Sequence, residues 1–524
     1  MEFVKKLFKY LVIIALVLGL TCGLIAGILF IFPNASLFGL RYSAKHKEET
    51  FIETDALLTK VNIETNNFDV VIKPSADADT SGDNNNLRVV IANNFTGYSN
   101  NGLTDTQIKK SDSDEFVNSA EIINYFPSFY NGSELNLILK EPTGLISYGS
   151  SKVVVYVPAN AEGVEYSIKT NTGKIYFDKN SNNSSKTLST KNINLEVKSS
   201  KGTFALDNVD MMAGSNLTIS NYIGRVEIKS INIQNVNINS NSGNFEFDKI
   251  SGNLTVEGNN PYIRANEVGG NVFYQNVVTG YVDIKQIGGE LLYESENGVL
   301  KVGKVLGTTT VKNKSGETTI NQIGEEGSNF LAKITTDSGF VILGTDSTQI
   351  YTLTSVNTGK GKVVIKNLAS SVKDEISTNS GRIEIDFVNS ASQKNLKATS
   401  SSGDIIVRNA YGNLDLKTAG KAFIYAELLS VAQNNKFVAD KGDIELKLPA
   451  PTNAGEKQYV LNLKNSVNNN LNLEIGNFIR TDFANNKDAD NMFVLRQVFP
   501  TDKTESEVLN KIEAKTSGVI KILE

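Results

Sequence analysis

Hydrophobic and polar residues alternate along most of this chain after a recurring glycine. In thirteen short phrases the fourth residue after the glycine is apolar, and the second is apolar in all but one, where Thr318 stands. The thirteen glycines are Gly173, Gly202, Gly224, Gly243, Gly280, Gly298, Gly316, Gly339, Gly381, Gly403, Gly420, Gly442 and Gly518. Strict alternation after a turn residue is typical of a half-buried strand. The pattern therefore predicts one short strand unit that is repeated many times.

The repeats have a short period. Gly202 and Gly442 are 240 residues apart, and twelve steps give a mean of 20 residues when the weaker repeats at Gly258 and Gly359 are counted. Such a step has room for two or three strands but not for a pair of helices. The turns are rich in Ser, Thr, Asn and Gly, and we expect the glycines to supply positive φ angles.

An all-β, stacked-strand β-solenoid (β-helix) of about 14 coils explains this pattern, because stacked coils hydrogen-bond to one another and bury their alternating residues in a narrow core. A row of β-sandwiches would need linkers between domains, and no Pro/Gly/Ser-rich linker interrupts residues 166–448. The register predicts that ten side chains point inward: Ile175, Phe177, Phe245, Phe247, Ile383, Ile385, Ile405, Val407, Ile444 and Leu446.

Residues 151–158 and 166–177, followed by a repeated phrase of the form ΦxΦxTxSGxΦxΦ, resemble a bacterial adhesin-like β-solenoid family of unknown function. The resemblance covers roughly residues 150–448 and is weaker over residues 50–149. It implies a stacked-strand fold and an extracytoplasmic location. It transfers no catalytic residue, because the shared motif is structural. The repeats are irregular at residues 259–261 and 360–361.

The N-terminus contains 23 uncharged residues, from Tyr10 to Phe32. A helix of this length can cross a bilayer, and Lys5, Lys6 and Lys9 in front of it favour a cytoplasmic N-terminus. We therefore expect a single-pass signal anchor in the cell membrane, with the bulk of the chain outside the cytoplasm. A cleaved signal peptide is the alternative, although the apolar stretch is longer than a usual signal-peptide core.

Composition excludes several classes of site. The first 49 residues hold six Lys/Arg and three Asp/Glu, which leaves 46 and 54 in the remaining 475 residues and a net charge of −8 there. This charge argues against a nucleic-acid binder. Cys22 and His46 are the only cysteine and histidine, so disulfides, Ser-His-Asp triads and zinc sites built on Cys or His are not expected in the body. We expect no cofactor and no metal.

Carboxylates at outward positions leave an enzyme open as an alternative. Paired carboxylates about 5–10 Å apart are sufficient for glycoside hydrolysis. The outward acidic residues are Glu227, Glu246, Asp283, Glu384, Asp404, Asp443 and Glu445. They are spread over many coils, and solubility alone explains charges on an outer face. We therefore expect no catalytic residues.

Four aromatic residues at predicted outward positions beside the turns are candidate ligand contacts: Tyr176, Tyr281, Phe340 and Phe423. Exposed aromatic rings can stack on sugars or anchor a protein partner.

Two segments interrupt the repeats. After a tether at 33–49, residues 50–165 are expected to hold the first coil, at 61–72, and an N-terminal cap with a polar excursion at 74–134. Residues 449–524 are expected to hold a second excursion, a cap and the last coil. Long excursions are alternative places for a binding site.

The sequence predicts a membrane-anchored, adhesin-like cell-surface protein that binds or spaces at the cell envelope without catalysis. The expected partners are the membrane and an envelope polysaccharide or surface protein, with no nucleic acid. Two alternatives stay open: a carbohydrate-active enzyme with carboxylates on the outer face, and a purely structural spacer. The oligomeric state is left open.

Overall fold

The structure is a computed structural model with two compact units, unit 1 (residues 1–211) and unit 2 (residues 212–524). The described residues are 2–31, 41–75, 85–99, 103–110, 116–118, 129–142, 144, 146–149, 151–177, 188–197, 204–207, 209–220, 223–229, 233–369, 375–388, 394–452, 457–483 and 486–524.

Unit 1 consists of one helix and short strands: α1 (Glu2–Ile31), β1 (Arg41–Glu53), β2 (Lys60–Thr65), β3 (Asp69–Pro74), β4 (Leu87–Ser99), β5 (Gln107–Lys109), β6 (Phe116–Asn118), β7 (Glu134–Lys140), β8 (Ile146–Gly149), β9 (Lys152–Val157), β10 (Val164–Thr170), β11 (Ile175–Phe177), β12 (Leu188–Val197) and β13 (Phe204–Asp207). Strand β14 (Val209–Ser220) begins in unit 1 and ends in unit 2.

Unit 2 is almost entirely strand: β15 (Ile223–Lys229), β16 (Asn235–Ile250), β17 (Leu254–Val268), β18 (Val272–Ile287), β19 (Leu291–Val305), β20 (Thr309–Ile323), β21 (Ala332–Thr336), β22 (Phe340–Leu343), β23 (Ser355–Thr358), β24 (Val363–Leu368), β25 (Glu375–Thr378), β26 (Ile383–Phe387), β27 (Lys394–Ser400), β28 (Ile405–Thr418), β29 (Ile424–Val431), β30 (Asn434–Val438), β31 (Ile444–Lys447), β32 (Tyr459–Asn465), β33 (Leu471–Ile475), β34 (Phe478–Arg480), β35 (Phe493–Phe499), the 3-10 turn η5 (Glu505–Glu507), β36 (Lys511–Thr516) and β37 (Ile520–Leu523).

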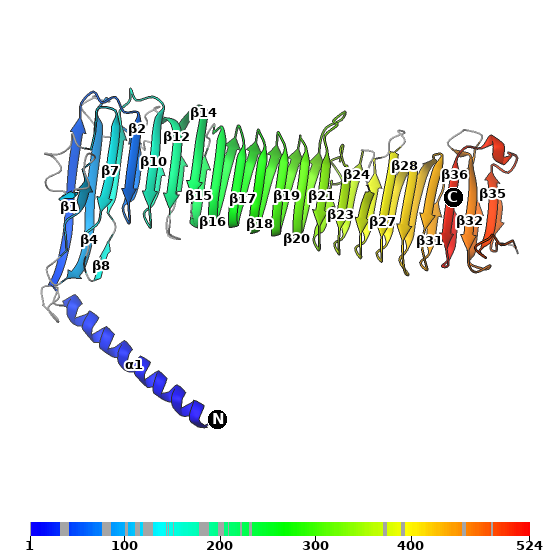
Figure 1. Ribbon diagram of the computed structural model, residues 1–524, viewed down its shortest axis with the longest axis horizontal. Helices are drawn as coiled ribbons and strands as arrows, with labels where there is room; N and C mark the ends of the chain where they lie inside the picture. Colours follow the sequence, from blue (N-terminus) through cyan, green and yellow to red (C-terminus); the bar gives the residue numbers. More distant parts are fainter. Residues whose placement is uncertain are drawn as a thin grey trace. The chain divides into compact units, whose positions relative to one another are not determined.

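The predicted β-solenoid is confirmed. Strands β16 to β31 of unit 2 lie side by side in chain order (Figure 1), and each turn pairs in parallel with the next. The step between paired residues varies from 18, for Val236 and Leu254, to 23, for Thr309 and Ala332. The longest step includes the extra loop between β20 and β21. These values bracket the predicted mean of 20.

The number of turns differs from the prediction. The solenoid has about 11 turns in chain order between Asn235 and Lys447, and not about 14. The prediction counted every glycine phrase as one turn of a single stack. It therefore included the phrases at Gly173, Gly202 and Gly224, which precede Asn235 in the sequence, and the phrase at Gly518, whose turn is inserted out of chain order.

The core consists of the residues that alternation placed inside. All ten predicted inward side chains are buried, with exposed fractions from 0% for Ile175 to 4% for Phe247. Threonine side chains at the turns are also buried, and their hydroxyls form hydrogen bonds with backbone amides. The hydroxyls of Thr336 and Thr378 accept hydrogen bonds from the amides of Gly339 and Gly381, both at 2.8 Å. The Thr in the repeated phrase therefore lies inside and satisfies a backbone donor that the turn leaves unpaired.

The recurring glycine has a different physical cause from the one we expected. In successive turns, the glycines that open the repeated phrase lie above one another at one corner of the solenoid, at Gly316, Gly339, Gly361, Gly381, Gly403 and Gly442. Among these six, Gly316 alone has a positive φ, at 116°. In Gly339, Gly361, Gly381 and Gly403 a Cβ atom would overlap the carbonyl oxygen of the glycine one turn earlier. The glycine is required because neighbouring turns bring their backbones together, not because the turn is left-handed. At Gly420 the glycine lies two residues before the corner, and Ala422 occupies the corner position instead. The carbonyl oxygen of Ala422 lies where a Cβ atom of Gly442 would be.

The C-terminal turn does not come last in the stack of unit 2. Strands β36 and β37 pair in parallel with β30 and β31 on one side and with β32 and β33 on the other. The chain leaves β31, forms the outer turn from β32 and β33, and returns to fill the space between (Figure 1). The expectation that residues 449–511 form an excursion before a last coil was therefore wrong about the order.

Unit 1 shows the same kind of reordering. The turn made by β2 and β3, which we expected to be the first, lies between the turn of β7 and β9 and the turn of β10 and β11. The outermost turn therefore comes from residues 134–157, which follow β2 and β3 in the chain.

Antiparallel strands cover both edges of the outermost turn in each unit. In unit 1, β5 pairs with β7 and β4 pairs with β9. In unit 2, β35 pairs with β32 and β34 pairs with β33. An uncovered parallel edge is a template for pairing with other chains, so these strands close the edges that the solenoid leaves open.

No helix among the described residues is long and apolar enough to qualify as a membrane span. The predicted signal anchor extends to Phe32, but residues 32–40 lie outside the described residues. The side chains of residues 24–31 lie outside them as well. The anchor therefore stays a prediction.

Candidate functional site

A groove of about 680 Å³ follows the glycine corner of unit 2 over four successive turns, β16 to β19. Its lining residues are Ser242, Gly243, Asn244, Asn260, Tyr262, Thr279, Gly280, Tyr281 and Asn297. Every lining side chain is uncharged.

Two stacked tyrosines form the aromatic part of this groove. Tyr262 and Tyr281 occupy the same position on neighbouring turns, and their rings are parallel within 7° with centroids 4.5 Å apart. Both rings are half-buried. Burial, followed by the nearby Asp283 carboxylate, raises the pKa of the Tyr281 hydroxyl. The Tyr281 hydroxyl donates a 3.4 Å hydrogen bond to this carboxylate.

A second pair of tyrosines supports the groove from inside. Tyr274 and Tyr293 are buried and stacked, with centroids 4.9 Å apart, and the Tyr274 hydroxyl donates a 3.2 Å hydrogen bond to the carbonyl of Pro261. This hydroxyl occupies the space where a Cβ of Gly280 would lie. Burial raises the pKa of Tyr293 to about 12. Gly280 is therefore glycine because the supporting tyrosine fills its side of the corner.

Three amide side chains in the groove are free to bind a ligand. Within the described part of the chain, the side chains of Asn244, Asn260 and Asn297 form no hydrogen bond, and all three are exposed. Asparagine amides both donate and accept hydrogen bonds. An aromatic surface flanked by free amides suits a ligand with apolar faces and hydroxyl or amide groups, such as a sugar.

The charged residues beside the groove neutralise one another. The Arg264 guanidinium lies 3.8 Å from the Asp283 carboxylate and donates a 2.9 Å hydrogen bond to the Tyr262 hydroxyl. The ammonium of Lys301 lies 5.8 Å from the centre of the Tyr281 ring. The outward column Glu246, Arg264, Asp283, Lys301 thus alternates in sign from turn to turn. The groove therefore has no net charge at its border.

The structure places the four aromatic candidates in different surroundings. Tyr281 lines the groove. Phe340 is 59% exposed and lies on the same outward column, three turns further on. Phe423 is half-buried beside Tyr425, with ring centroids 6.5 Å apart. Tyr176 belongs to unit 1 and packs against Val71, Val90 and Val154, so most of its ring is not available to a ligand.

Tyr262, the partner of Tyr281, was missed from the sequence. It follows Pro261 in an irregular repeat, where the expected corner glycine is replaced. The pairing of Gly243 with Pro261 shows that proline occupies the glycine position there. Alignment by the apolar residues Ile263 and Ala265, instead of by glycine, would have revealed Tyr262.

The outward carboxylates are engaged in contacts with the protein. Glu384 lies 2.7 Å from Arg382 and 3.1 Å from Lys362. The carboxylates of Asp404 and Asp443 accept hydrogen bonds from the backbone amides of the next turn, at 3.0 and 2.7 Å. Glu445 pairs with Lys521 at 3.3 Å. The side chain of Glu227 lies outside the described residues.

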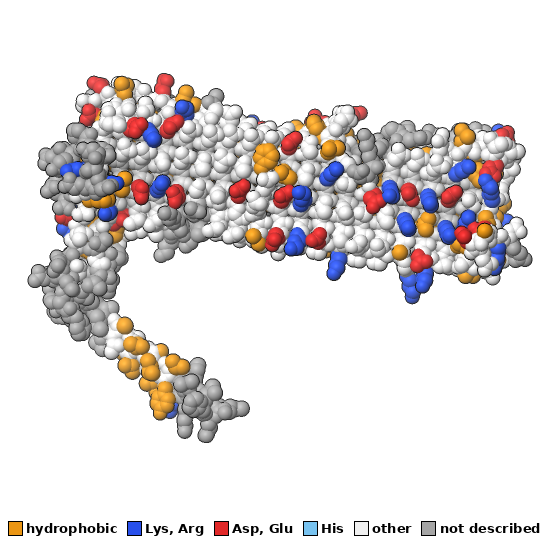
Figure 2. Space-filling view, in the orientation of Figure 1, with side chains coloured by type: hydrophobic (Ala, Val, Ile, Leu, Met, Phe, Trp, Pro, Cys, Tyr) orange, Lys and Arg blue, Asp and Glu red, His pale blue; other side chains and the backbone are white. Residues whose placement is uncertain are grey.

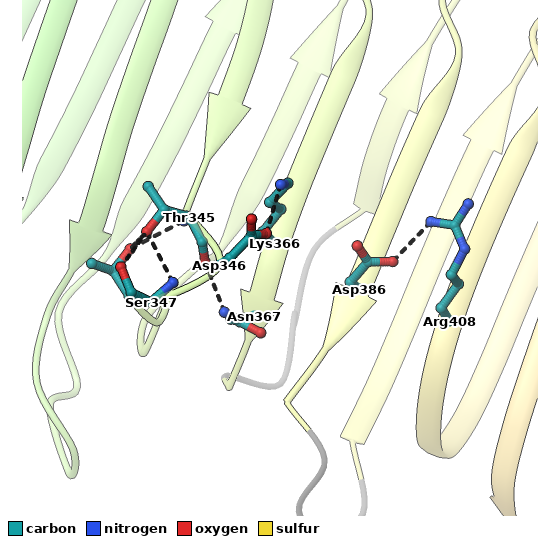
Figure 3. A network of polar contacts seen from close by, with 8 residues as sticks. Thr345, Asp346, Ser347, Lys366, Asn367, Asp386 and Arg408 are labelled. Carbon is teal, nitrogen blue, oxygen red and sulfur yellow. Dashed lines mark hydrogen bonds and ion pairs between the residues drawn. The ribbon is translucent and has the colours of Figure 1, made fainter.

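Charged columns on another part of unit 2 show the same internal pairing. In Figure 3, Asp346 pairs with Lys366 at 2.7 Å and Asp386 pairs with Arg408 at 3.0 Å. The Asn367 amide donates a hydrogen bond to the Thr345 carbonyl beside them. Each acid faces a base on the neighbouring turn, which favours a stabilising role over a carboxylate pair for hydrolysis.

The described surface of unit 2 has no large area of one charge in the view of Figure 2, where Lys and Arg side chains alternate with Asp and Glu side chains. A second groove of about 640 Å³ borders the first on the same corner and includes Glu294, Glu296, Lys312, Lys314 and Asp337. Glu294 and Lys312 pair at 2.6 Å. This groove lacks aromatic rings, so the tyrosine groove is the stronger candidate for a binding site.

Comparison with known proteins adds no identification, because no family model, no curated protein and no solved structure matches this chain. The resemblance to the adhesin-like solenoid family therefore stays a prediction.

Proposed function

We propose that this protein is a non-catalytic, membrane-anchored binding protein of the cell envelope, which attaches to glycan through the tyrosine groove. The N-terminal apolar segment is proposed as the anchor. The observation that supports glycan binding most strongly is the stacked pair Tyr262 and Tyr281 beside three free asparagine amides. Aromatic faces and amide groups together match the apolar faces and polar groups of a pyranose ring.

The solenoid supports a binding role in a second way. Parallel ladders and a packed core hold the groove on rigid strands, so little conformational entropy is lost when a ligand binds. The engaged outward carboxylates favour binding over cleavage, since hydrolysis needs one protonatable acid and one free carboxylate close together.

The proposal is tested with full-length protein on an array of envelope glycans, followed by analysis of the soluble products. We expect retention without cleavage, and we expect Tyr281→Ala to weaken binding about tenfold or more because an anchoring ring is lost. Ile479→Ala is the control, because Ile479 is 67% exposed and lies outside the groove. Cleaved products would favour the enzyme, and absence of retention would favour a structural spacer.

A further inference from the structure

The groove is one part of a longer outward column of unit 2. In-register pairing places Asn244, Tyr262, Tyr281, Val299, Glu317 and Phe340 on six successive turns. We call this set the aromatic column. Adjacent turns are about 4.8 Å apart, so Tyr262 and Phe340 are separated by four steps, or about 19 Å along the stack.

Phe340 is unusual for a side chain on a solenoid face. It is 59% exposed, and strand faces in water normally present polar side chains. Its neighbour on the preceding turn, Glu317, is held by a 2.9 Å hydrogen bond from the Thr319 hydroxyl. Val299, which lies between Glu317 and Tyr281, is half-buried. Past the groove, the column therefore presents an apolar side chain, a carboxylate that is already hydrogen-bonded, and the exposed ring of Phe340.

The charges along this path do not select an ionic ligand. Arg264 and Asp283 face each other, and Lys301 lies over the Tyr281 ring. The Glu317 carboxylate in the column accepts the hydrogen bond from the Thr319 hydroxyl. The groove itself is lined by uncharged side chains. An anionic or cationic polymer would have to compete with these contacts, whereas an uncharged chain would leave them in place.

We propose that the ligand is an uncharged glycan chain that lies along the stack, with one part against Tyr262 and Tyr281 and another part against Phe340. This inference rests on the proposed function and adds the charge, the length and the direction of the glycan. A ligand that spans about 19 Å must contain several sugar rings. A short oligomer can fill the tyrosine groove but cannot reach Phe340.

The test compares chain lengths on full-length protein. The probes are N-acetylglucosamine oligomers and β-1,4-linked glucose oligomers of two and six sugars, with a galacturonate hexamer as the anionic probe. We expect at least one neutral hexamer to bind about tenfold or more tightly than its dimer. Phe340→Ala should remove most of this gain while leaving the affinity for the dimer unchanged. Ile479→Ala should leave both affinities unchanged.

The outcomes separate this inference from the proposed function. If Tyr281→Ala weakens binding but Phe340→Ala has no effect on the hexamer, the glycan does not extend along the column and the inference is overturned. Tighter binding of the galacturonate hexamer than of either neutral hexamer also overturns it, although the tyrosine groove would remain a glycan site. Failure of every glycan to depend on Tyr281 would overturn the proposed function as well.

Discussion

At the scale of single residues, alternation predicted the inside and outside of the strands correctly because each turn has one narrow core. Phe245 lies two residues after Gly243 and is fully buried, whereas Phe340 lies one residue after Gly339 and is 59% exposed. We expect Phe245→Ala to reduce the free energy of unfolding by about 3–5 kcal/mol, because it leaves a cavity. Phe340→Ala should change it by less than about 0.5 kcal/mol. Urea unfolding followed by circular dichroism measures both, and equal losses would contradict the register.

The stacked glycines provide a second prediction at this scale. Gly381→Ala should lower the melting temperature clearly, because its Cβ would overlap the carbonyl oxygen of Gly361 and force neighbouring turns apart. Ser380→Ala, at an exposed position immediately before it, is the matched control. Calorimetry of both variants tests the idea, and a melting temperature unchanged by Gly381→Ala would show that the corner has room for a side chain.

The sequence could not distinguish the two reasons for a glycine. A positive φ and a close backbone approach both exclude a side chain, and a single sequence shows only that the side chain is missing. The buried Thr378 was hidden for a similar reason: in isolation it looks like a polar turn residue, and only its bond to the amide of Gly381 explains its burial.

At the scale of strands, parallel stacking places each outward side chain between the equivalent side chains of the preceding and the following turn. The column Glu375, Lys397, Asp415, Lys436 and Glu513 alternates in charge over five turns. The hydrogen bond to Glu375, at 2.5 Å, raises the pKa of Lys397. Like charges directly opposite one another are destabilising, so alternation also disfavours pairing of a turn with the wrong neighbour.

Reversal of one charge tests this account. Lys397→Glu places three acids in a row, and we expect the melting temperature to fall by a modest amount at low salt and to recover as salt screens the repulsion. The double variant Lys397→Glu with Glu375→Lys should recover part of the loss without added salt. Thermal melts at low and high ionic strength provide the measurement, and a loss that does not depend on salt would assign it to packing instead of charge.

The pairing of strands across the chain order was beyond the reach of the sequence. The phrase at Gly518 is as regular as its neighbours, and nothing in it shows that β36 and β37 lie between β31 and β33. Covering strands such as β4 and β35 pair antiparallel at the edges, and they lack the glycine phrase by which turns were recognised. The predicted order therefore failed at both ends of the repeats, while the fold class was correct.

At the scale of the whole chain, the reordering makes the C-terminus essential to unit 2. Removal of residues 510–524 would delete the turn between β30–β31 and β32–β33 and leave parallel edges uncovered. We expect the amides of β30 and β31 to lose hydrogen-exchange protection and the truncated protein to aggregate. Leu509→Ala, which alters a side chain that is 73% exposed just before this turn, is the control. Full protection of β31 after truncation would contradict the inserted turn.

Of the candidate site, the sequence located Tyr281 and Phe340 but could not show that they share one column. Irregular steps of 18 to 23 residues prevent an alignment of turns by counting. Only the pairing of Tyr281 with Val299, Val299 with Glu317 and Glu317 with Phe340 joins them.

A diffraction structure of the full-length protein with an N-acetylglucosamine hexamer or a glucose hexamer, whichever neutral chain it retains, would show directly whether glycan lies along the aromatic column. We expect intact sugar rings against Tyr262 and Tyr281, with the glycan chain continuing along the stack to Phe340. A chain that crosses the strands, occupies another surface or is found cleaved would contradict it.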